Sequence, residues 1–340
     1  MNRLCAAFLA LGLAAAAQAS PPESEPAPYA GRPEVRAFIR QMVKRHAFDA
    51  RELQQLFARA RREQAVLDAI QPTASEADQS WELYRGIFVN PKRIGAGLEF
   101  WARYGDVLAR AQRVYGVPEE FIVAIIGVET FYGRHTGRWR VVDALATLAF
   151  DYPPRAEFFR QELANYLLYA RKSGIDVFSV KGSYAGAIGI PQFMPGSYLK
   201  YAVDFDGDGV ADLSNSAADA IGSVANFLKQ HGWQSGEAVQ YEARISGSGF
   251  RAFLDGGLQP RHRLAELAKA GVVPVGWSGQ PRDDARAVLV ELESPDAQSE
   301  YRLGLQNFYV ITRYNNSLFY ACAVSDLAAA LRAAHDGRSP

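Results

Sequence analysis

One segment of the chain is apolar on every side of a helix. Residues 121–128 read Phe-Ile-Val-Ala-Ile-Ile-Gly-Val and contain no polar side chain. A surface helix carries apolar residues along one stripe only, so a helix that is apolar all round has to be buried on all sides. Other elements must pack around it, and a chain of 340 residues is long enough to supply them. The segment therefore predicts a large core built around one central helix.

The first residues are typical of export. Residues 1–3 give a positive start, residues 4–16 are apolar without interruption, and residues 17–19 form a small-x-small cleavage site. This pattern predicts a secretory signal peptide over 1–19 that is removed from the mature protein. The alternative is an N-terminal membrane anchor, for which the apolar run is short. Cys5 does not end the apolar run, where a lipidated cysteine would lie, so we expect a soluble periplasmic protein with no transmembrane segment.

Cysteine and charge exclude two further classes of protein. The chain has only Cys5 and Cys322, so the mature protein keeps one thiol and no internal disulfide, and Cys322 is expected to be buried and inert. Lys plus Arg and Asp plus Glu both number 37, which gives a formal net charge of zero. Nucleic-acid binding favours a strongly basic domain, so no nucleic-acid partner is expected.

Helical periodicity dominates most of the sequence. Apolar residues at Val35, Phe38, Ile39, Met42 and Val43 fall at i, i+3, i+4, i+7 and i+8, and similar patterns recur along the chain. We expect helical segments at 35–43, 48–69, 81–88, 97–114, 118–170, 217–231 and 318–334, and loop at 182–216. Residues 239–245 and 287–292 alternate like strands, 271–284 are rich in Gly and Pro, and 309–314 are ambiguous. The fold class is therefore mainly α (α+β), with a small β-containing insert.

Glu129 is the first candidate for chemistry. It follows the apolar helix and precedes Thr-Phe-Tyr-Gly, so its carboxyl lies among apolar and aromatic neighbours. Burial disfavours the charged form, which raises the pKa of a carboxyl and lets it donate a proton near neutral pH. The alternative is a structural glutamate that pairs with Arg134 or Arg138, or a solvated helix end. The residues alone leave both possibilities open.

An acidic loop over 204–219 is the second candidate. Aspartates at positions 1, 3 and 5 with glycine at position 6 match the first half of an EF-hand calcium loop. Position 12 is Asn215 where the standard loop has Glu, so Asp219 is the nearest carboxylate that can close the site. The candidate ligands are Asp204, Asp206, Asp208, the carbonyl of Val210, Asp212 and Asp219. A bound Ca²⁺ would be structural, and the alternative is a surface Asp-Gly turn.

Two further segments could contact a neutral ligand. Residues 181–195 are rich in small residues and place Ser183, Tyr184, Gln192 and Phe193 in one loop. Hydroxyl, amide and aromatic groups of this kind suit a sugar, although a plain Gly/Pro loop with two core aromatics is the alternative. Residues 309–317 form a polar cluster or a simple turn. The scattered histidines and the lack of a phosphate loop predict no histidine metal site and no organic cofactor.

Together these segments resemble the lytic murein transglycosylase B family. The resemblance lies in Gly-Val-Pro at 116–118, Ile-Gly-Val-Glu-Thr-Phe-Tyr-Gly at 126–133, and the segments 143–153, 185–189, 192–195, 219–226 and 311–315. It covers residues 33–330 in order. The family implies a lysozyme-like core, a helical N-terminal domain, a small β-containing insert and an EF-hand-like calcium site. The expected domains are 1–19 signal peptide, 20–33 flexible lead-in, 34–115 helical N-terminal domain, 116–236 with 306–340 catalytic core, and 237–305 α+β insert.

The resemblance also implies an activity and its residues. The family cleaves the β-1,4 bond between N-acetylmuramic acid and N-acetylglucosamine in peptidoglycan, without water, and leaves 1,6-anhydro ends. Glu129 occupies the catalytic position, Ser183, Gln192, Tyr314 and Asn315 would line the sugar sites, and Arg155 could meet the muramoyl carboxylate or peptide. Two alternatives remain at this point: a muramidase that uses water, and a non-catalytic calcium-stabilised peptidoglycan-binding protein. We expect a monomer whose partner is the glycan strand.

Overall fold

The computed structural model describes residues 28–71, 80–254, 257–276, 285–294 and 298–337. The predicted signal peptide and most of the predicted lead-in lie outside these residues. The helices are α1 Pro33–His46, α2 Ala50–Arg59, α3 Gln64–Ala69, α4 Trp81–Phe88, α5 Pro91–Tyr115, α6 Glu119–Thr130, α7 Val141–Asp151, α8 Ala156–Ser173, α9 Pro195–Tyr201, α10 Ala217–Gln230, α11 Leu264–Lys269, α12 Gln306–Thr312 and α13 Leu318–His335. The strands are β1 Trp139–Arg140, β2 Lys181–Gly182, β3 Gln240–Ile245, β4 His262–Arg263, β5 Val272–Pro274, β6 Arg286–Leu292 and β7 Glu300–Gly304.

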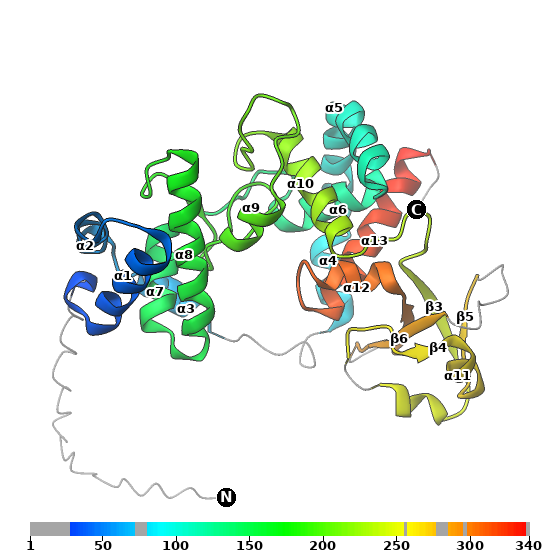
Figure 1. The fold of residues 1–340 in the computed structure, drawn as a ribbon. Coiled ribbons are helices and arrows are strands. Elements are labelled where there is room, and N and C mark those ends of the chain that lie inside the picture. The colour runs from blue at the N-terminus through cyan, green and yellow to red at the C-terminus, as the bar shows by residue number, and fades with distance from the viewer. Residues whose placement is uncertain (1–27, 72–79, 255–256, 277–284, 295–297, 338–340) are drawn as a thin grey trace, which may run out of the picture.

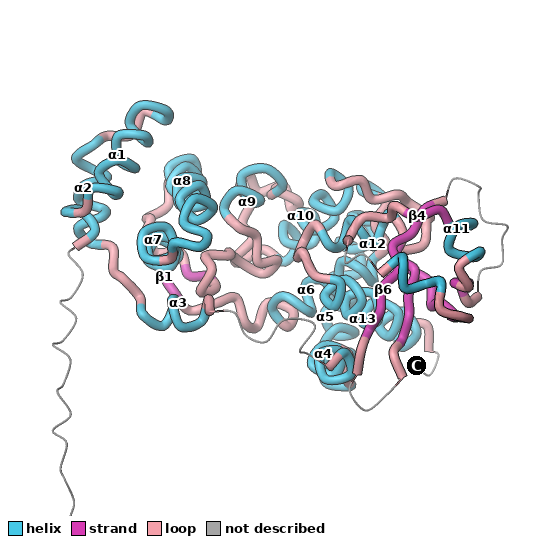
Figure 2. The backbone as a smooth tube through the Cα atoms, turned by 90° about the horizontal axis from the view of Figure 1, so that it is seen from below, coloured by secondary structure: helices cyan, strands magenta, loops and turns pink. Residues whose placement is uncertain are grey.

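The helices gather in two groups, which Figures 1 and 2 show at opposite ends of the molecule. At one end α3 contacts α7, which packs along α8, and α1 and α2 contact each other. At the other end α4, α5 and α6 contact α13. Helices α9 and α10 lie between the groups, because α9 contacts α8 and α10 contacts α5 and α6. A single apolar core runs through both groups.

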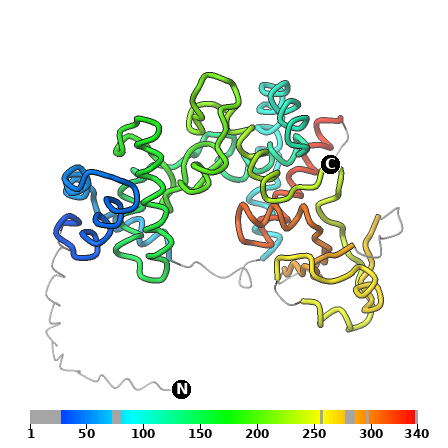
Figure 3. Tube along the Cα trace, viewed as in Figure 1, coloured from blue at the N-terminus to red at the C-terminus, as the bar shows by residue number. Residues whose placement is uncertain are grey.

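Helix α6 is the centre of the second group. Its segment from Ile122 to Ile126 has no exposed surface, as the all-round apolar pattern predicted. Helices α5, α10 and α13 contact it from different sides. In Figure 3 the C-terminal helix lies beside α6, although nearly 200 residues separate them in sequence. The packing places the end of α6 next to residues that come from the C-terminal part of the chain.

A five-stranded antiparallel sheet forms the predicted β-containing region. Its strand order is β4-β6-β7-β3-β5, and β6 pairs with β7 in a register that sets Val290 opposite Arg302. One face has its own small core, made of Phe250, Leu264, Leu267, Val272, Ala287, Leu289 and Leu303. The predicted strands at 239–245 and 287–292 are confirmed as β3 and β6. The other three strands are short or lack clear alternation, and the sequence pattern missed them.

Several local predictions differ from the structure. The predicted helix 48–69 is two helices, α2 and α3, because residues 60–63 leave the helical path and their backbone meets α7: the N–H of Arg61 binds Asp143. The ambiguous segment 309–314 is mostly helix α12, and the predicted loop 182–216 contains helix α9. Val43 belongs to the predicted apolar face but is 37% exposed, because it lies at the edge of the stripe that α1 turns inward.

Packing divides the predicted N-terminal segment 34–115 between the two helical groups. Helix α3 contacts α7, whereas α4 and α5 contact α13. The boundaries of the individual domains stay predictions. Cys322 is fully buried on α13, as expected for an inert thiol. In the described part of the chain, no helix combines the length and apolar character needed to cross a membrane.

Candidate active site at the end of helix α6

Glu129 lies in the last turn of α6. The helix ends at Thr130 because Phe131 adopts a left-handed conformation, with φ 51° and ψ 52°. The Glu129 side chain keeps part of its surface exposed. Tyr320, in the first turn of α13, donates a hydrogen bond from its hydroxyl to Oε1 of Glu129 at 2.6 Å. The contact between α6 and α13 therefore places a phenol directly on this carboxylate.

The surroundings of Glu129 favour its protonated form. Burial raises its pKa to about 7, and the hydrogen bond from Tyr320 opposes this rise. The predicted partners of a structural glutamate lie elsewhere: Arg134 pairs with Glu99 at 3.6 Å, and Arg138 lies over the ring of Trp139. The alternative that Glu129 pairs with Arg134 or Arg138 is therefore wrong. A carboxyl with this pKa can both donate and accept a proton near neutral pH.

Tyr314 joins the C-terminal turn to the loop before α9. Its ring stacks on Tyr320, with centroids 6.5 Å apart and an interplanar angle of 13°. Its hydroxyl donates to the carbonyl of Pro191 at 2.5 Å, and its ring lies 5.8 Å from that of Phe193. Of the predicted sugar-binding residues, Tyr314 is therefore brought beside the Glu129–Tyr320 pair. Phe193 is only 2% exposed and packs behind Tyr314 in the core, so its ring supports the site and is not open to a sugar.

The loop that carries Ser183 and Gln192 is held by its own hydrogen bonds. The Ser183 hydroxyl accepts from the N–H of Ala187 at 3.0 Å. Gln192 has φ of 51°, and its amide nitrogen donates to the carbonyls of Thr136 at 3.0 Å and Gly189 at 2.8 Å. A left-handed glutamine is uncommon and costs conformational energy, so these contacts keep the loop in one shape.

Thr130 ties this loop to the end of α6. Its hydroxyl donates to the carbonyl of Ile190 at 2.8 Å and accepts from the N–H of Gly133 at 2.9 Å. The N–H of Ile190 in turn donates to the carbonyl of Leu213 at 2.8 Å. The loop, the residue after Glu129 and the acidic segment around Leu213 therefore form one hydrogen-bonded assembly.

Three predicted binding residues lie outside this group of contacts. Tyr184 is 37% exposed and its ring meets the edge of Trp139. Asn315 is exposed in the turn between α12 and α13. Arg155 is exposed at the start of α8, and the aromatic partners described for it are its neighbours Phe158 and Phe159. Among the described contacts, none joins these three residues to Glu129.

The acidic loop brings three of its predicted ligands together. Carboxylate oxygens of Asp204, Asp206 and Asp219 lie within 4.8 Å of one another. Asp219 is fully buried and also accepts hydrogen bonds from the N–H groups of Phe205 at 2.6 Å and Asp212 at 2.7 Å. Converging carboxylate oxygens are the ligands that a hard cation such as Ca²⁺ takes. These three residues fit such an ion.

The other predicted ligands of the loop are not in this group. The carboxylate of Asp208 accepts from the N–H of Val210 at 2.9 Å, and that of Asp212 accepts from Ser214 and Asn215. These bonds stabilise turns in the loop. The three carboxylates that converge all belong to the predicted set, and the roles of Asp208, the Val210 carbonyl and Asp212 as ligands stay predictions.

Tyr320 is the residue of this candidate site that the sequence did not predict. It occupies a helical segment rich in alanine, where a tyrosine is indistinguishable from an ordinary core aromatic. The only available signal was its spacing of six residues from Tyr314, which has no meaning until the turn between α12 and α13 is known. The packing of α13 on α6 supplies the missing information.

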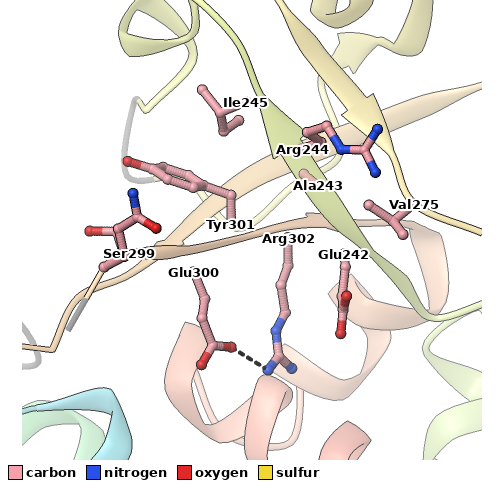
Figure 4. Close-up of a pocket in the computed structure, with 10 residues that line it drawn as sticks. Glu242, Ala243, Arg244, Ile245, Val275, Ser299, Glu300, Tyr301 and Arg302 are labelled. Carbon is pink, nitrogen blue, oxygen red and sulfur yellow. Dashed lines mark hydrogen bonds and ion pairs between the residues drawn. The ribbon is translucent and has the colours of Figure 1, made fainter.

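A separate hollow of about 460 Å³ lies on the sheet, and Figure 4 shows its charged lining. Glu242, Glu300 and Arg302 extend from neighbouring strands on one side of it. Arg302 is 6% exposed and binds Asp326 of α13 at 2.5 Å and Glu300 at 3.1 Å. The pair with Asp326 attaches the sheet to the helical body, whereas the pair with Glu300 lies within β7. Glu129 is not part of the lining.

Comparisons with known proteins agree with this arrangement. Residues 30–329 match the family model described as Transglycosylase SLT domain. The chain is 44% identical to membrane-bound lytic murein transglycosylase B of Escherichia coli (strain K12) over 311 residues. The matched region covers 89% of this chain and 84% of the relative.

Solved structures are similar over the same length. Soluble lytic transglycosylase SltB1 of Pseudomonas aeruginosa is 47% identical, with a TM-score of 0.83 over 90% of this chain and 100% of that one. Lytic transglycosylase Slt35 of Escherichia coli, solved in complex with calcium, is 43% identical, with a TM-score of 0.80 over 91% and 95%. SltB3 of Pseudomonas aeruginosa, in complex with NAG-anhNAM-pentapeptide, is 32% identical, with a TM-score of 0.74 over 88% and 79%. The chain has the mainly helical, lysozyme-like fold of the lytic murein transglycosylase B family, belongs to that family, and is a lytic transglycosylase of peptidoglycan.

Proposed function

We propose that the chain cleaves the β-1,4 bond between N-acetylmuramic acid and N-acetylglucosamine without water, with Glu129 as the only catalytic carboxyl. The observation that carries this proposal is the carboxyl itself, whose pKa burial raises to about 7 while Tyr320 holds one of its oxygens. At neutral pH a large fraction of such a carboxyl is protonated, so it can act first as an acid. Its conjugate base is then available for the second step.

The reaction needs no other carboxylate. Glu129 gives its proton to the glycosidic oxygen, and the bond from that oxygen to C1 of the muramoyl residue breaks. The Glu129 carboxylate then removes the proton of the muramoyl C6 hydroxyl, whose oxygen bonds to C1 and closes the 1,6-anhydro ring. Ordinary glycosidases use a second carboxylate to activate water or to attack the sugar. An intramolecular hydroxyl has an effective molarity that reaches about 10⁵ M or more, which replaces an activated water.

The interactions around Glu129 support a mechanism with one carboxyl. The pKa shifts of Glu129, Tyr314 and Tyr320 arise from burial and from one another, with Tyr84 as a further influence on Tyr320. None of the described causes involves a second carboxylate. The anhydro sugar named in the complex of SltB3 supports the same type of product for this chain.

The substrate lies across the loop and the turn beside Glu129 in this proposal. Tyr314 offers an aromatic face beside the Glu129–Tyr320 pair, and the buried Phe193 ring supports it from below the surface. Ser183 and Gln192 offer polar groups on a rigid loop. Tyr184, Asn315 and Arg155 are exposed and would meet more distant parts of the glycan strand or its peptide, with Arg155 facing a carboxylate. The protein works as a monomer on the strand.

Asp204, Asp206 and Asp219 would hold a structural Ca²⁺ in the acidic loop. The calcium complex of Slt35 and the convergence of these three carboxylates support this assignment. The ion would supply only stability, by neutralising three carboxylates that otherwise repel each other. The apolar N-terminal run supports export to the periplasm, with residues 1–19 removed.

Mass spectrometry of a sacculus digest tests the activity. The native protein is expected to release muropeptides whose glycan ends are lighter by one water than reducing ends. Glu129→Gln keeps the shape of the side chain but cannot donate or accept the proton, so turnover is expected to fall by at least about 10³-fold. Glu157→Gln, at a side chain that is 92% exposed on α8, is the matched control and is expected to match the native rate.

Two results would contradict the proposal. Reducing ends in the digest would identify a hydrolytic muramidase instead. Unchanged turnover of Glu129→Gln would remove Glu129 from the reaction and mean that a different group acts as the acid.

A further inference from the structure

The chain reverses direction directly after Glu129 in an unusual conformation. Phe131 and Tyr132 have φ of 51° and 62°, and Gly133 follows with φ of 83°. Left-handed backbone is common for glycine but uncommon for bulky residues, and two consecutive examples persist only where surrounding contacts hold them. The question is therefore which contacts hold this reversal, since Glu129 lies only two residues before it.

The Tyr132 ring fills a gap between α5 and α6 that two glycines create. A Cβ atom added to Gly127 would lie 2.7 Å from the end of the Tyr132 ring, and one added to Gly97 would lie 2.5 Å from its hydroxyl. The ring also packs 5.7 Å from that of Phe100. At the far side of the gap the Tyr132 hydroxyl donates to the carbonyl of Arg93 at 3.0 Å. Side chains at Gly97 or Gly127 would exclude this placement.

Arg93 contacts the same reversal through its side chain. Its guanidinium donates to the carbonyl of Gly127, in the last turn of α6, and lies 4.9 Å from the centre of the Phe131 ring. The Gly127 carbonyl also accepts from the N–H of Phe131, which ends the helix. Arg93 of α5 therefore binds the end of α6 with its guanidinium, and its backbone carbonyl accepts the hydrogen bond from the Tyr132 hydroxyl.

We infer that Arg93 and Tyr132 are positioning residues for Glu129. They clamp the last turn of α6 and the two left-handed residues after it onto α5, which fixes the direction of the Glu129 side chain toward Tyr320. None of the contacts described for these two residues reaches Glu129, so their effect is transmitted through the backbone of residues 127–132. The inference rests on the proposed catalytic role of Glu129.

Tyr132→Phe tests the clamp, because it removes the hydroxyl and keeps the ring in its gap. A loosened reversal admits water to Glu129 and weakens its contact with Tyr320. The loss of burial decides the direction of the pKa shift, because burial is the larger of the two influences on this carboxyl. We expect kcat on soluble glycan strands to fall at least tenfold, KM to change less than threefold, and the pH above which activity declines to move downward by half a unit or more. The downward shift follows because burial is what keeps this carboxyl protonated.

Matched controls separate positioning from general loss of packing. Tyr104→Phe makes the same chemical change on α5, at a ring that also packs on Phe100, and is expected to leave kcat and the pH profile unchanged. Arg93→Met is expected to act like Tyr132→Phe, and Arg103→Met, at an exposed position of α5, to act like the native protein. Circular dichroism at the assay temperature checks that each variant is folded. If Arg93→Met does not fold, the result for Tyr132→Phe alone decides the test.

Each outcome has one meaning. A native kcat and an unshifted pH profile for Tyr132→Phe, with an inactive Glu129→Gln, would overturn the positioning role and leave the proposed function intact. Full activity of Glu129→Gln would overturn the proposed function and the inference together. A lower melting temperature for Tyr132→Phe without any change in kcat or pH profile would make the clamp structural only and would also overturn the inference.

Discussion

Glu129 lies where burial and one hydrogen bond act on its carboxyl in opposite directions. Burial raises its pKa to about 7, and Tyr320 lowers it by donating to the charged form. Tyr320 itself is buried, and its own pKa is raised well above the usual range by burial and by the nearby Glu129. The tyrosine therefore stays protonated and remains a donor throughout the working pH range.

Replacing Tyr320 by phenylalanine should raise the pKa of Glu129. An acid is active while it is protonated, so the rate of the native protein is expected to decline as the pH rises through about 7. A hydrogen bond to a charged group contributes roughly 1.5–3 kcal/mol, and one pKa unit corresponds to about 1.4 kcal/mol. In Tyr320→Phe the decline should move upward by about one pH unit or more. Rates measured from pH 5 to 9 test this shift.

The sign of the shift is the informative part of this experiment. Tyr320→Phe should move the decline upward, whereas Tyr132→Phe should move it downward. Tyr104→Phe, which contacts neither Glu129 nor Tyr320 in the described contacts, serves as the control with no shift. A downward shift in Tyr320→Phe would mean that water replaces the phenol and that the tyrosine contributes mainly to burial.

At the scale of elements, the acidic loop and helix α10 form one unit. Ser216 caps α10 by accepting from the N–H of Asp219 at 3.2 Å, and its hydroxyl donates to Asp206 at 2.6 Å. Asp219 binds the N–H groups of the loop from the first turn of α10. The first turn of α10 therefore holds the loop in place through hydrogen bonds. The three converging carboxylates repel one another unless a cation or protons neutralise them.

Millimolar Ca²⁺ should stabilise the protein against heat. For a dissociation constant of about 10⁻⁴–10⁻³ M, 10 mM Ca²⁺ would add roughly 1–3 kcal/mol to the free energy of unfolding, or a few degrees in Tm. Asp204→Asn should abolish most of this shift. Asp176→Asn, whose carboxylate accepts from Phe178 in a turn outside the loop, should preserve it. Thermal melts with chelator and with Ca²⁺ measure the effect, and equal melting temperatures would argue against the site.

At the scale of the whole molecule, one buried ion pair attaches the sheet to the helical body. Arg302 of β7 binds Asp326 of α13, and Asp326 also binds Arg85 of α4 at 2.6 Å. Arg302 lies over the Trp81 ring at 5.2 Å. The sheet has its own small core, so this cluster is the main charged contact that its strands make with α4 and α13 in the described part of the chain.

Asp326→Ala should destabilise the protein strongly. It leaves the buried guanidinium of Arg302 without its main partner, and breaking one side of a buried ion pair costs about 3–5 kcal/mol. Glu300→Gln removes the other partner, whose side chain is 55% exposed, and should cost less than about 1 kcal/mol. Urea unfolding measures both variants. Similar free energies of unfolding for the two would show that the pair with Asp326 does not carry the attachment.

Local patterns predicted the parts of the fold that follow from short-range rules. The all-round apolar segment before Glu129 is the buried helix α6, and the terminal alanine-rich segment is α13. The break between α2 and α3 and the short strands were missed, because each depends on a partner distant in sequence. Arg61, for example, binds Asp143 of α7.

The candidate site divides in the same way. The sequence by itself determined that a carboxyl follows a buried helix, that acidic residues alternate in one loop, and that the chain resembles a known family. Only the tertiary structure decided that Tyr320 binds Glu129, that three of the acidic residues converge, and that Arg93 holds the end of α6. The physical reason is that burial follows from composition along a segment, whereas a hydrogen bond between distant residues depends on how helices pack.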